Sequence, residues 1–163
     1  MKTSTLSESR TWVDPLMSPP RARPLGRAPR VLLAEDDSEL RQLVLESLQK
    51  DGHEVVEAAD GRQLLIRITN HYRLRPDPEP IDLIVSDIRM PVISGLEILQ
   101  GLREAHWTTP IVLITAFAEL ETRIRATELG AELLDKPFTM SALRSTVRDL
   151  LRASRAPGVR GES

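Results

Sequence analysis

The sequence contains no cysteine, and aromatic residues make up only 3% of its 163 residues. Without cysteine the chain forms neither a disulfide nor a thiolate metal site, and a cytoplasmic location is the simplest expectation. Charges or glycines interrupt every strand-like apolar run well before the roughly 20 residues that a membrane-spanning helix needs. No apolar segment follows the basic residues at the start, so we expect neither a secretory signal nor a membrane span.

Charge of one sign is also scarce overall, because 22 basic and 24 acidic side chains leave a formal net charge of -2. The distribution is nevertheless uneven. Residues 1–30 contain six basic and two acidic side chains, whereas residues 31–152 contain fourteen basic and twenty-one acidic ones. A solvated basic leader is the simplest interpretation, and contact with nucleic acid, a membrane or an acidic partner stays open as an alternative.

Proline is concentrated in two places. Five of the 12 prolines lie between residues 15 and 29, which predicts a disordered N-terminal extension over residues 1–29. Three more alternate with acidic residues between His71 and Pro80, which predicts a long surface insertion. We therefore expect one folded domain over residues 30–152, followed by a flexible C-terminal tail over residues 153–163.

Within residues 30–152, apolar runs alternate with amphipathic stretches. Strands are predicted over residues 31–34, 54–58, 81–86, 111–115 and 132–134. Helices are predicted around residues 40–48, 64–68 and 96–102, then over residues 119–129, with Gly130 as the stop, and over residues 141–152. Leu40, Leu43, Val44 and Leu48 are expected to share the buried face of the first helix. The alternation predicts an α/β fold with a doubly wound parallel sheet, (βα)₅, in the flavodoxin-like strand order 2-1-3-4-5.

Polar side chains follow four of the predicted strands. These are Glu35, Asp36 and Asp37 after the first, Asp87 after the third, Thr115 at the end of the fourth, and Asp135 and Lys136 after the fifth. Ligands of open parallel sheets bind at the carboxyl ends of the strands, so these groups are expected to converge. Clustered carboxylates repel one another unless a cation lies between them, and oxygen ligands without His or Cys favour Mg²⁺.

This set of groups suits phosphoryl transfer. A carboxylate acts as the nucleophile and forms an acyl phosphate, while a lysine ammonium and a hydroxyl stabilise the charge of the phosphoryl oxygens. Lys136 and Thr115 are the candidates for these two roles. His53, His71 and His106 show no metal-ligand spacing and are interpreted as surface residues.

From Val31 to about Arg152 the chain resembles the response-regulator receiver family of two-component signalling. The resemblance is carried by Val31-Leu-Leu-Ala-Glu-Asp-Asp, Asp87-Ile-Arg-Met-Pro-Val-Ile-Ser-Gly95, Ile111-Val-Leu-Ile-Thr-Ala116 and Lys136-Pro-Phe138, with Arg41 five residues after Asp36. It implies that Asp87 is the phosphoacceptor and that Glu35, Asp36, Asp87 and the carbonyl of Arg89 bind Mg²⁺. It further implies a cis peptide between Lys136 and Pro137, and it places Phe117 beside the path of the hydrolytic water.

In two places the sequence departs from the family pattern. Leu133 stands where the family usually has a Tyr or Phe that reports the switch, and the segment from Gly130 to Lys136 is one residue shorter than the common form. Both departures bear on how Thr115 is coupled to the surface and leave the phosphorylation chemistry itself intact.

We accordingly predict a stand-alone receiver rather than a turnover enzyme. It is expected to take its phosphoryl group from a histidine kinase or a phosphotransfer protein and to signal to a downstream protein without binding DNA directly. A degenerate receiver that acts as a phosphorylation-independent interaction module is the alternative. A phosphate-processing enzyme or flavin binder on the same fold is disfavoured, because no phosphate-cradling Ser/Thr/Gly loop follows the first strand.

Overall fold

The computed structural model describes residues 26–73 and 80–155, in which strands and helices alternate. The strands are β1 (Arg30–Ala34), β2 (Glu54–Ala58), β3 (Leu83–Asp87), β4 (Ile111–Thr115) and β5 (Glu132–Asp135). The helices are α1 (Ser38–Lys50), α2 (Gly61–Arg73), α3 (Gly95–Glu104), α4 (Leu120–Glu128) and α5 (Met140–Arg155). No helix in these two ranges is long and apolar enough to cross a membrane.

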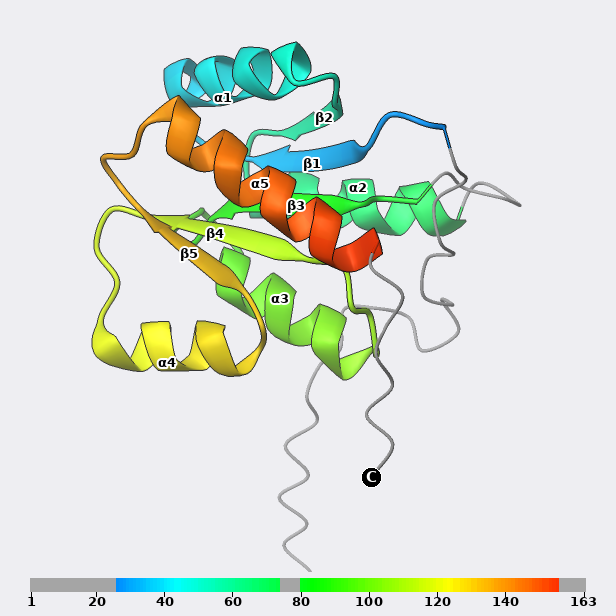
Figure 1. The fold of residues 1–163 in the computed structure, drawn as a ribbon. Coiled ribbons are helices and arrows are strands. Elements are labelled where there is room, and N and C mark those ends of the chain that lie inside the picture. Colours follow the sequence, from blue (N-terminus) through cyan, green and yellow to red (C-terminus); the bar gives the residue numbers. More distant parts are fainter. Residues whose placement is uncertain (1–25, 74–79, 156–163) are drawn as a thin grey trace, which may run out of the picture.

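The strands form one parallel sheet in the order β2-β1-β3-β4-β5, which confirms the predicted flavodoxin-like topology. Helices cover both faces of the sheet, with α1 and α5 on one side and α2 and α3 on the other (Figure 1). Because all strands run in the same direction, the carboxyl ends of β1, β3, β4 and β5 lie along one edge.

Two apolar layers hold the helices to the sheet, and they follow directly from the period-2 alternation of a strand. Val31 and Leu33 point into the layer shared with α1 and α5, whereas Leu32 and Ala34 point into the layer shared with α2 and α3. All residues of β1, β3 and β4 are buried. Continuous apolar runs in the sequence therefore mark the strands that are covered on both faces.

Local hydrogen bonds define the ends of α1 and α4. Asp37 caps α1, since its side chain accepts hydrogen bonds from the amides of Glu39 and Leu40. Gly130, with a φ of 76°, ends α4, as predicted. The amide of Gly130 donates to the Thr127 carbonyl and the amide of Ala131 to the Ala126 carbonyl, which is the pattern of a glycine-terminated helix.

Some local predictions were wrong. Leu43 is 54% exposed, because Val44, Ser47 and Leu48 form the buried face of α1 and Leu43 lies to one side of it. His53 is half-buried rather than a surface residue. Helix α2 continues to Arg73, and α5 continues to Arg155. What was expected of residues 1–25, 74–79 and 156–163 lies outside the described residues.

Candidate functional site

A cluster of three carboxylates lies at the carboxyl edge of the sheet. Glu35 follows β1 directly, Asp36 comes next, and Asp87 is the last residue of β3. One oxygen from each of the three lies within 4.8 Å of the others. Glu35 and Asp87 are buried, whereas Asp36 is exposed. Separate strand ends thus bring these residues together, as the sequence predicts.

Lys136 joins the cluster from the segment after β5. Its Nζ donates to Oδ2 of Asp87 at 2.8 Å and lies 3.3 Å from Oε2 of Glu35. The peptide between Lys136 and Pro137 is cis, as the family resemblance implies. The amide of Lys136 also donates to the carbonyl of Thr115 at 2.7 Å, which fixes the end of β5 against the end of β4.

Burial changes the electrostatics of the site, because the acidic side chains of Glu35 and Asp87 lie close together and are both buried. Burial, together with the charge of Asp87, raises the pKa of Glu35 to about 7. Burial by itself would lower the pKa of Lys136. The hydrogen bond to Asp87 and the charges of Asp87 and Glu35 outweigh it, so the pKa of Lys136 is raised. One lysine therefore faces more carboxylates than it can neutralise, so the residues present fit a divalent cation.

Thr115 ends β4 beside this cluster. Thr115 is 1% exposed, and its hydroxyl has no hydrogen-bond partner in the part of the chain that the structure describes. The strand register sets Asp87 opposite Ile114, the neighbour of Thr115. A buried hydroxyl without a partner costs about 1–3 kcal/mol, so Thr115 is ready to bind an oxygen that enters the site.

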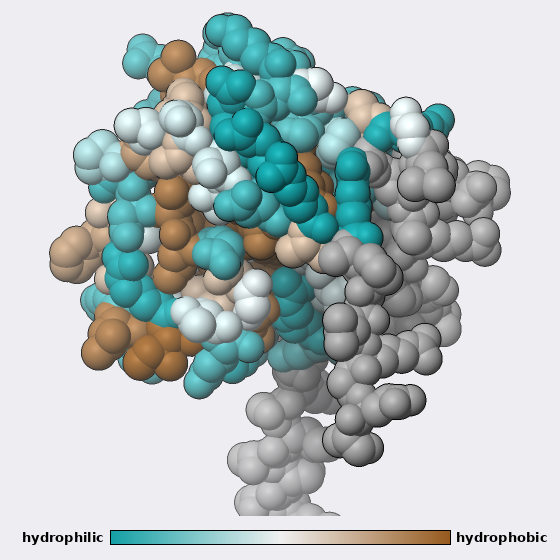
Figure 2. Space-filling model, viewed as in Figure 1, coloured by the Kyte–Doolittle hydropathy of each residue, from teal (hydrophilic) through white to brown (hydrophobic). Residues whose placement is uncertain are grey.

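The rim of the site contains Arg89 and Phe117. The Arg89 amide donates to Oδ1 of Asp87 at 3.1 Å, and its guanidinium reaches the Phe117 carbonyl at 3.5 Å. The Phe117 side chain is 70% exposed, as is much of Leu120 at the start of α4. Figure 2 shows apolar surface near this end of α4, at the lower left, and more hydrophilic surface over α5.

Leu133 lies in the middle of β5, level with Leu113 of β4. Its side chain is partly buried and packs against the apolar layer on the α2 and α3 face. In this structure the residue at the family's aromatic position thus belongs to the edge of the core.

The sequence analysis assigned no structural role to three residues that support the site. Arg41 and Gly95 were named only as part of the family pattern, and Ser86 was not singled out. Arg41 donates to the Glu35 carbonyl at 2.7 Å and pairs with Glu57 at 3.4 Å. The Ser86 hydroxyl donates to the Asp87 carbonyl at 2.9 Å. A Cβ on Gly95 would lie 2.5 Å from that carbonyl oxygen, so only glycine lets α3 begin against the Asp87 backbone. The sequence did indicate Gly95, because a glycine eight residues after Asp87 is part of the motif that carries the family resemblance.

Comparison with known proteins gives a consistent result. The family model described as the response regulator receiver domain matches residues 31–148. The transcriptional regulatory protein CpxR of Escherichia coli K12 is 36% identical over 126 residues, which cover 77% of this chain and 50% of CpxR. PrrA of Mycobacterium tuberculosis, also a transcriptional regulatory protein, is 35% identical and is covered to 51%. The chain thus spans about half the length of these curated relatives.

Solved structures resemble the chain over most of their own length. The chemotaxis response regulator CheY4 of Vibrio cholerae matches with a TM-score of 0.64 and 31% identity, over 76% of this chain and 99% of that one. The receiver domain of the Francisella response regulator 1452 matches with a TM-score of 0.68 and 28% identity, over 78% and 99% of the two chains.

Proposed function

The chain belongs to the response regulator receiver family, and we propose that it accepts a phosphoryl group on Asp87 from a histidine kinase or a phosphotransfer protein. The observation that carries the proposal is the buried Asp87 carboxylate held 2.8 Å from the Lys136 ammonium, beside Glu35 and Asp36. The chain then acts as a phosphoacceptor that catalyses its own phosphorylation, not as an enzyme that turns over a separate substrate.

Mg²⁺ fits the carboxylates of Glu35, Asp36 and Asp87, with the carbonyl of Arg89 as a further oxygen ligand. The unbalanced negative charge of the cluster and the raised pKa of Glu35 support this assignment. The ion would neutralise the carboxylates and the incoming phosphoryl oxygens.

The remaining groups position and stabilise the transfer. A carboxylate oxygen of Asp87 attacks the phosphorus of a phosphohistidine, so that an O–P bond forms while the N–P bond breaks and its electron pair returns to the imidazole nitrogen. The Lys136 ammonium, already at the carboxylate, and the Thr115 hydroxyl face the charge on the transferred oxygens. Asp87 is buried, so its carboxylate is largely shielded from bulk water.

Signalling begins when the Thr115 hydroxyl gains the phosphoryl oxygens as hydrogen-bond partners. The hydroxyl moves toward the phosphoryl oxygens, and Leu133 moves into the space released under the loop after β4. A downstream protein then docks on the altered surface of α4, β5 and α5. The relatives CpxR and PrrA are named transcriptional regulatory proteins. For the receiver described here, we propose that output proceeds through a protein contact and not through direct contact with DNA.

Transfer from a small donor tests the proposal. Incubation with acetyl phosphate and Mg²⁺ should add one phosphoryl group, detectable by intact mass, that is stable in acid and labile in base. Asp87→Asn should abolish the adduct, whereas Asp149→Asn, an exposed aspartate on α5, should leave it unchanged. An adduct that persists in Asp87→Asn would overturn the assignment of the phosphoacceptor.

A degenerate receiver is the second candidate, and Leu133 at the aromatic position is the observation that favours it. Absence of any adduct on the wild-type chain, combined with retention of a binding partner by Asp87→Asn, would support this alternative.

A further inference from the structure

Arg123 on α4 connects two backbone segments that lead into the site. Its guanidinium contacts both carboxylate oxygens of Asp135, one of them at 3.2 Å, and its Nε donates to the Ala118 carbonyl at 3.3 Å. Ala118 belongs to the loop between β4 and α4, and Asp135 is the last residue of β5. We call this set of contacts the Arg123 brace.

The two segments joined by the brace carry the groups that face the phosphoryl site. Thr115 lies three residues before Ala118, and Lys136 directly follows Asp135. Thr115 and Asp135 are register partners in the sheet, and the Lys136 amide donates to the Thr115 carbonyl at 2.7 Å. Any displacement of Thr115 therefore acts on the backbone that the brace holds.

We propose that Arg123 is a positioning residue whose brace holds the loop after β4 against the end of β5 and thereby favours the unphosphorylated position of Thr115. The inference rests on the proposed function. The buried Thr115 hydroxyl gains a partner only when phosphoryl oxygens arrive, and its movement draws residues 116–119 along. The contact with the Ala118 carbonyl and the ion pair to Asp135 resist that movement.

The expected effect is modest, because the pair is open to solvent. The side chains of Arg123 and Asp135 are 39% and 55% exposed, and exposed ion pairs are weak and screened by salt. Loss of the brace should increase the apparent affinity for beryllofluoride, a phosphoryl mimic, by about two- to fivefold. The difference from wild type should shrink at high ionic strength, which would not follow from a general packing defect.

The experiment is an NMR titration of the full chain with beryllofluoride at saturating Mg²⁺, which follows the amides of residues 115–119 and 133–136. Arg123→Gln and Asp135→Asn should both bind beryllofluoride two- to fivefold more tightly than wild type, and the double variant should gain no more than either single one. The two substitutions change the net charge in opposite directions. A simple electrostatic effect on the anion would therefore give opposite signs.

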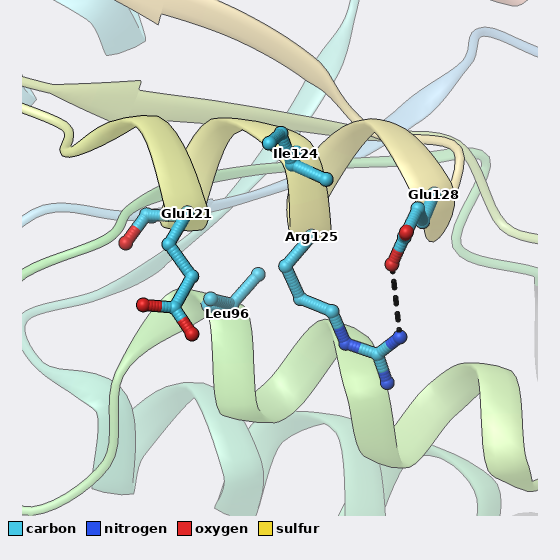
Figure 3. A pocket seen from close by; sticks show the side chains of 6 residues that line it. Leu96, Glu121, Ile124, Arg125 and Glu128 are labelled. Carbon is cyan, nitrogen blue, oxygen red and sulfur yellow. Dashed lines mark hydrogen bonds and ion pairs between the residues drawn. The ribbon is translucent and has the colours of Figure 1, made fainter.

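Arg125→Gln is the matched control. Arg125 lies on the same helix, but it pairs with Glu128 of α4 itself at 3.4 Å, as Figure 3 shows, in the groove between α3 and α4. This variant loses the same charge without touching β5 and should bind beryllofluoride as wild type does. Urea unfolding of each variant establishes that the fold is retained.

Unchanged or weaker binding in Arg123→Gln, or an equal gain in Arg125→Gln, would overturn the role of the brace while leaving the proposed function in place. Failure of the proposed function would be different in kind: the wild type would not bind beryllofluoride, or Asp87→Asn would still bind it. In either of those cases the brace has no phosphoryl-dependent equilibrium to bias, and the inference falls as well.

Discussion

At the scale of single residues, the site depends on a few side chains whose environments differ sharply. Glu35 is buried and its pKa is raised to about 7, whereas Asp36, the next residue, is exposed to solvent. Asp87 has its carboxylate shared between the Lys136 ammonium and the Arg89 amide. The residue least encumbered by protein contacts is thus Asp36, which makes it the best site for testing metal binding separately from folding.

Asp36→Asn should weaken Mg²⁺ binding at least about tenfold, because it removes one carboxylate ligand from the cluster. The free energy of unfolding without metal should stay the same or rise slightly, since the substitution relieves repulsion among the acids. Calorimetric titration with MgCl₂ measures the affinity. Glu39→Gln, which removes an exposed carboxylate from the first turn of α1, serves as control, and equal affinities in the two variants would contradict the assignment.

Phe117→Ala should accelerate loss of the phosphoryl group severalfold. The exposed ring lies on the rim, with its carbonyl at the Arg89 guanidinium, and a bulky apolar group there hinders in-line attack by water. The decay of the phosphorylated chain, followed by intact mass, gives the rate. Leu120→Ala truncates another exposed apolar side chain of the rim and should leave the rate unchanged. Decay at the wild-type rate in Phe117→Ala would remove the ring from the mechanism.

At the scale of elements, the end of α3 contains a strained backbone conformation. α3 ends like α4, with the Trp107 amide donating to the Leu102 carbonyl and the His106 amide to the Arg103 carbonyl. The residue in the left-handed conformation is, however, a histidine with a φ of 62°, where α4 has Gly130. Non-glycine residues pay a penalty of about 1–2 kcal/mol in this region. His106 is exposed, and nothing described in its surroundings compensates for the penalty.

His106→Gly should therefore raise the free energy of unfolding by about 0.5–1 kcal/mol, and Gly130→Ala should lower it by about 1 kcal/mol. Among the described residues, and leaving aside the two chain neighbours of Gly130, no atom lies within 4 Å of a Cβ built there, so the expected loss comes from the backbone conformation. Urea unfolding of both variants measures the difference. A destabilised His106→Gly variant would mean that the imidazole makes a contribution larger than the strain.

At the scale of the whole molecule, titratable groups are buried at both ends of the sheet. At the carboxyl edge lies Glu35, and at the opposite edge lies His53, whose two ring nitrogens are buried without hydrogen bonds in the described structure. Burial lowers the pKa of His53, although the nearby charges of Asp51 and Asp82 act in the other direction. The two buried groups therefore make contributions of opposite sign to the pH dependence of stability.

In the unfolded chain His53 binds a proton with its ordinary pKa of about 6.5. In the folded protein the pKa of His53 is lower. The contribution of His53 to the free energy of unfolding is therefore complete above about pH 6.5 and is lost as the pH falls through the lower, folded pKa. The raised pKa of Glu35 acts oppositely, since its contribution is complete below about pH 4.5 and is lost as the pH rises through about 7.

His53→Gln isolates the first contribution. The free energy of unfolding of wild type minus that of the variant should decrease between pH 7.5 and pH 5.5, measured by urea unfolding in metal-free buffer. Glu35 is present in both chains, so its contribution cancels in the difference. A difference that is flat or that increases toward low pH would show that His53 is protonated within the folded protein.

Much of the molecule was determined by the sequence itself, for identifiable physical reasons. Strands β1, β3 and β4 each contain a continuous apolar run, and such runs are typical where helices cover both faces of a parallel sheet. Parallel strands joined by helices then place Glu35, Asp87 and Thr115 at a common edge whatever the details of packing. Gly130 ends α4 through its own backbone conformation and nearby hydrogen bonds, so local chemistry suffices to predict it.

Other features exist only because distant segments meet. The exposure of Leu43 depends on which side of α1 turns to the sheet, and periodicity alone leaves a neighbouring residue equally plausible. The lowered pKa of His53 depends on its tertiary surroundings, which include the charge of Asp82 just before β3. The contact of Arg123 with Asp135 and Ala118 requires α4 to lie beside β5, and no motif marks it. Composition and spacing thus determined the fold and the identity of the acidic edge. The tertiary structure decided the pKa of Glu35, the absence of a hydrogen-bond partner for the Thr115 hydroxyl in the described residues, and the Arg123 brace. Each of these depends on the three-dimensional surroundings of a side chain.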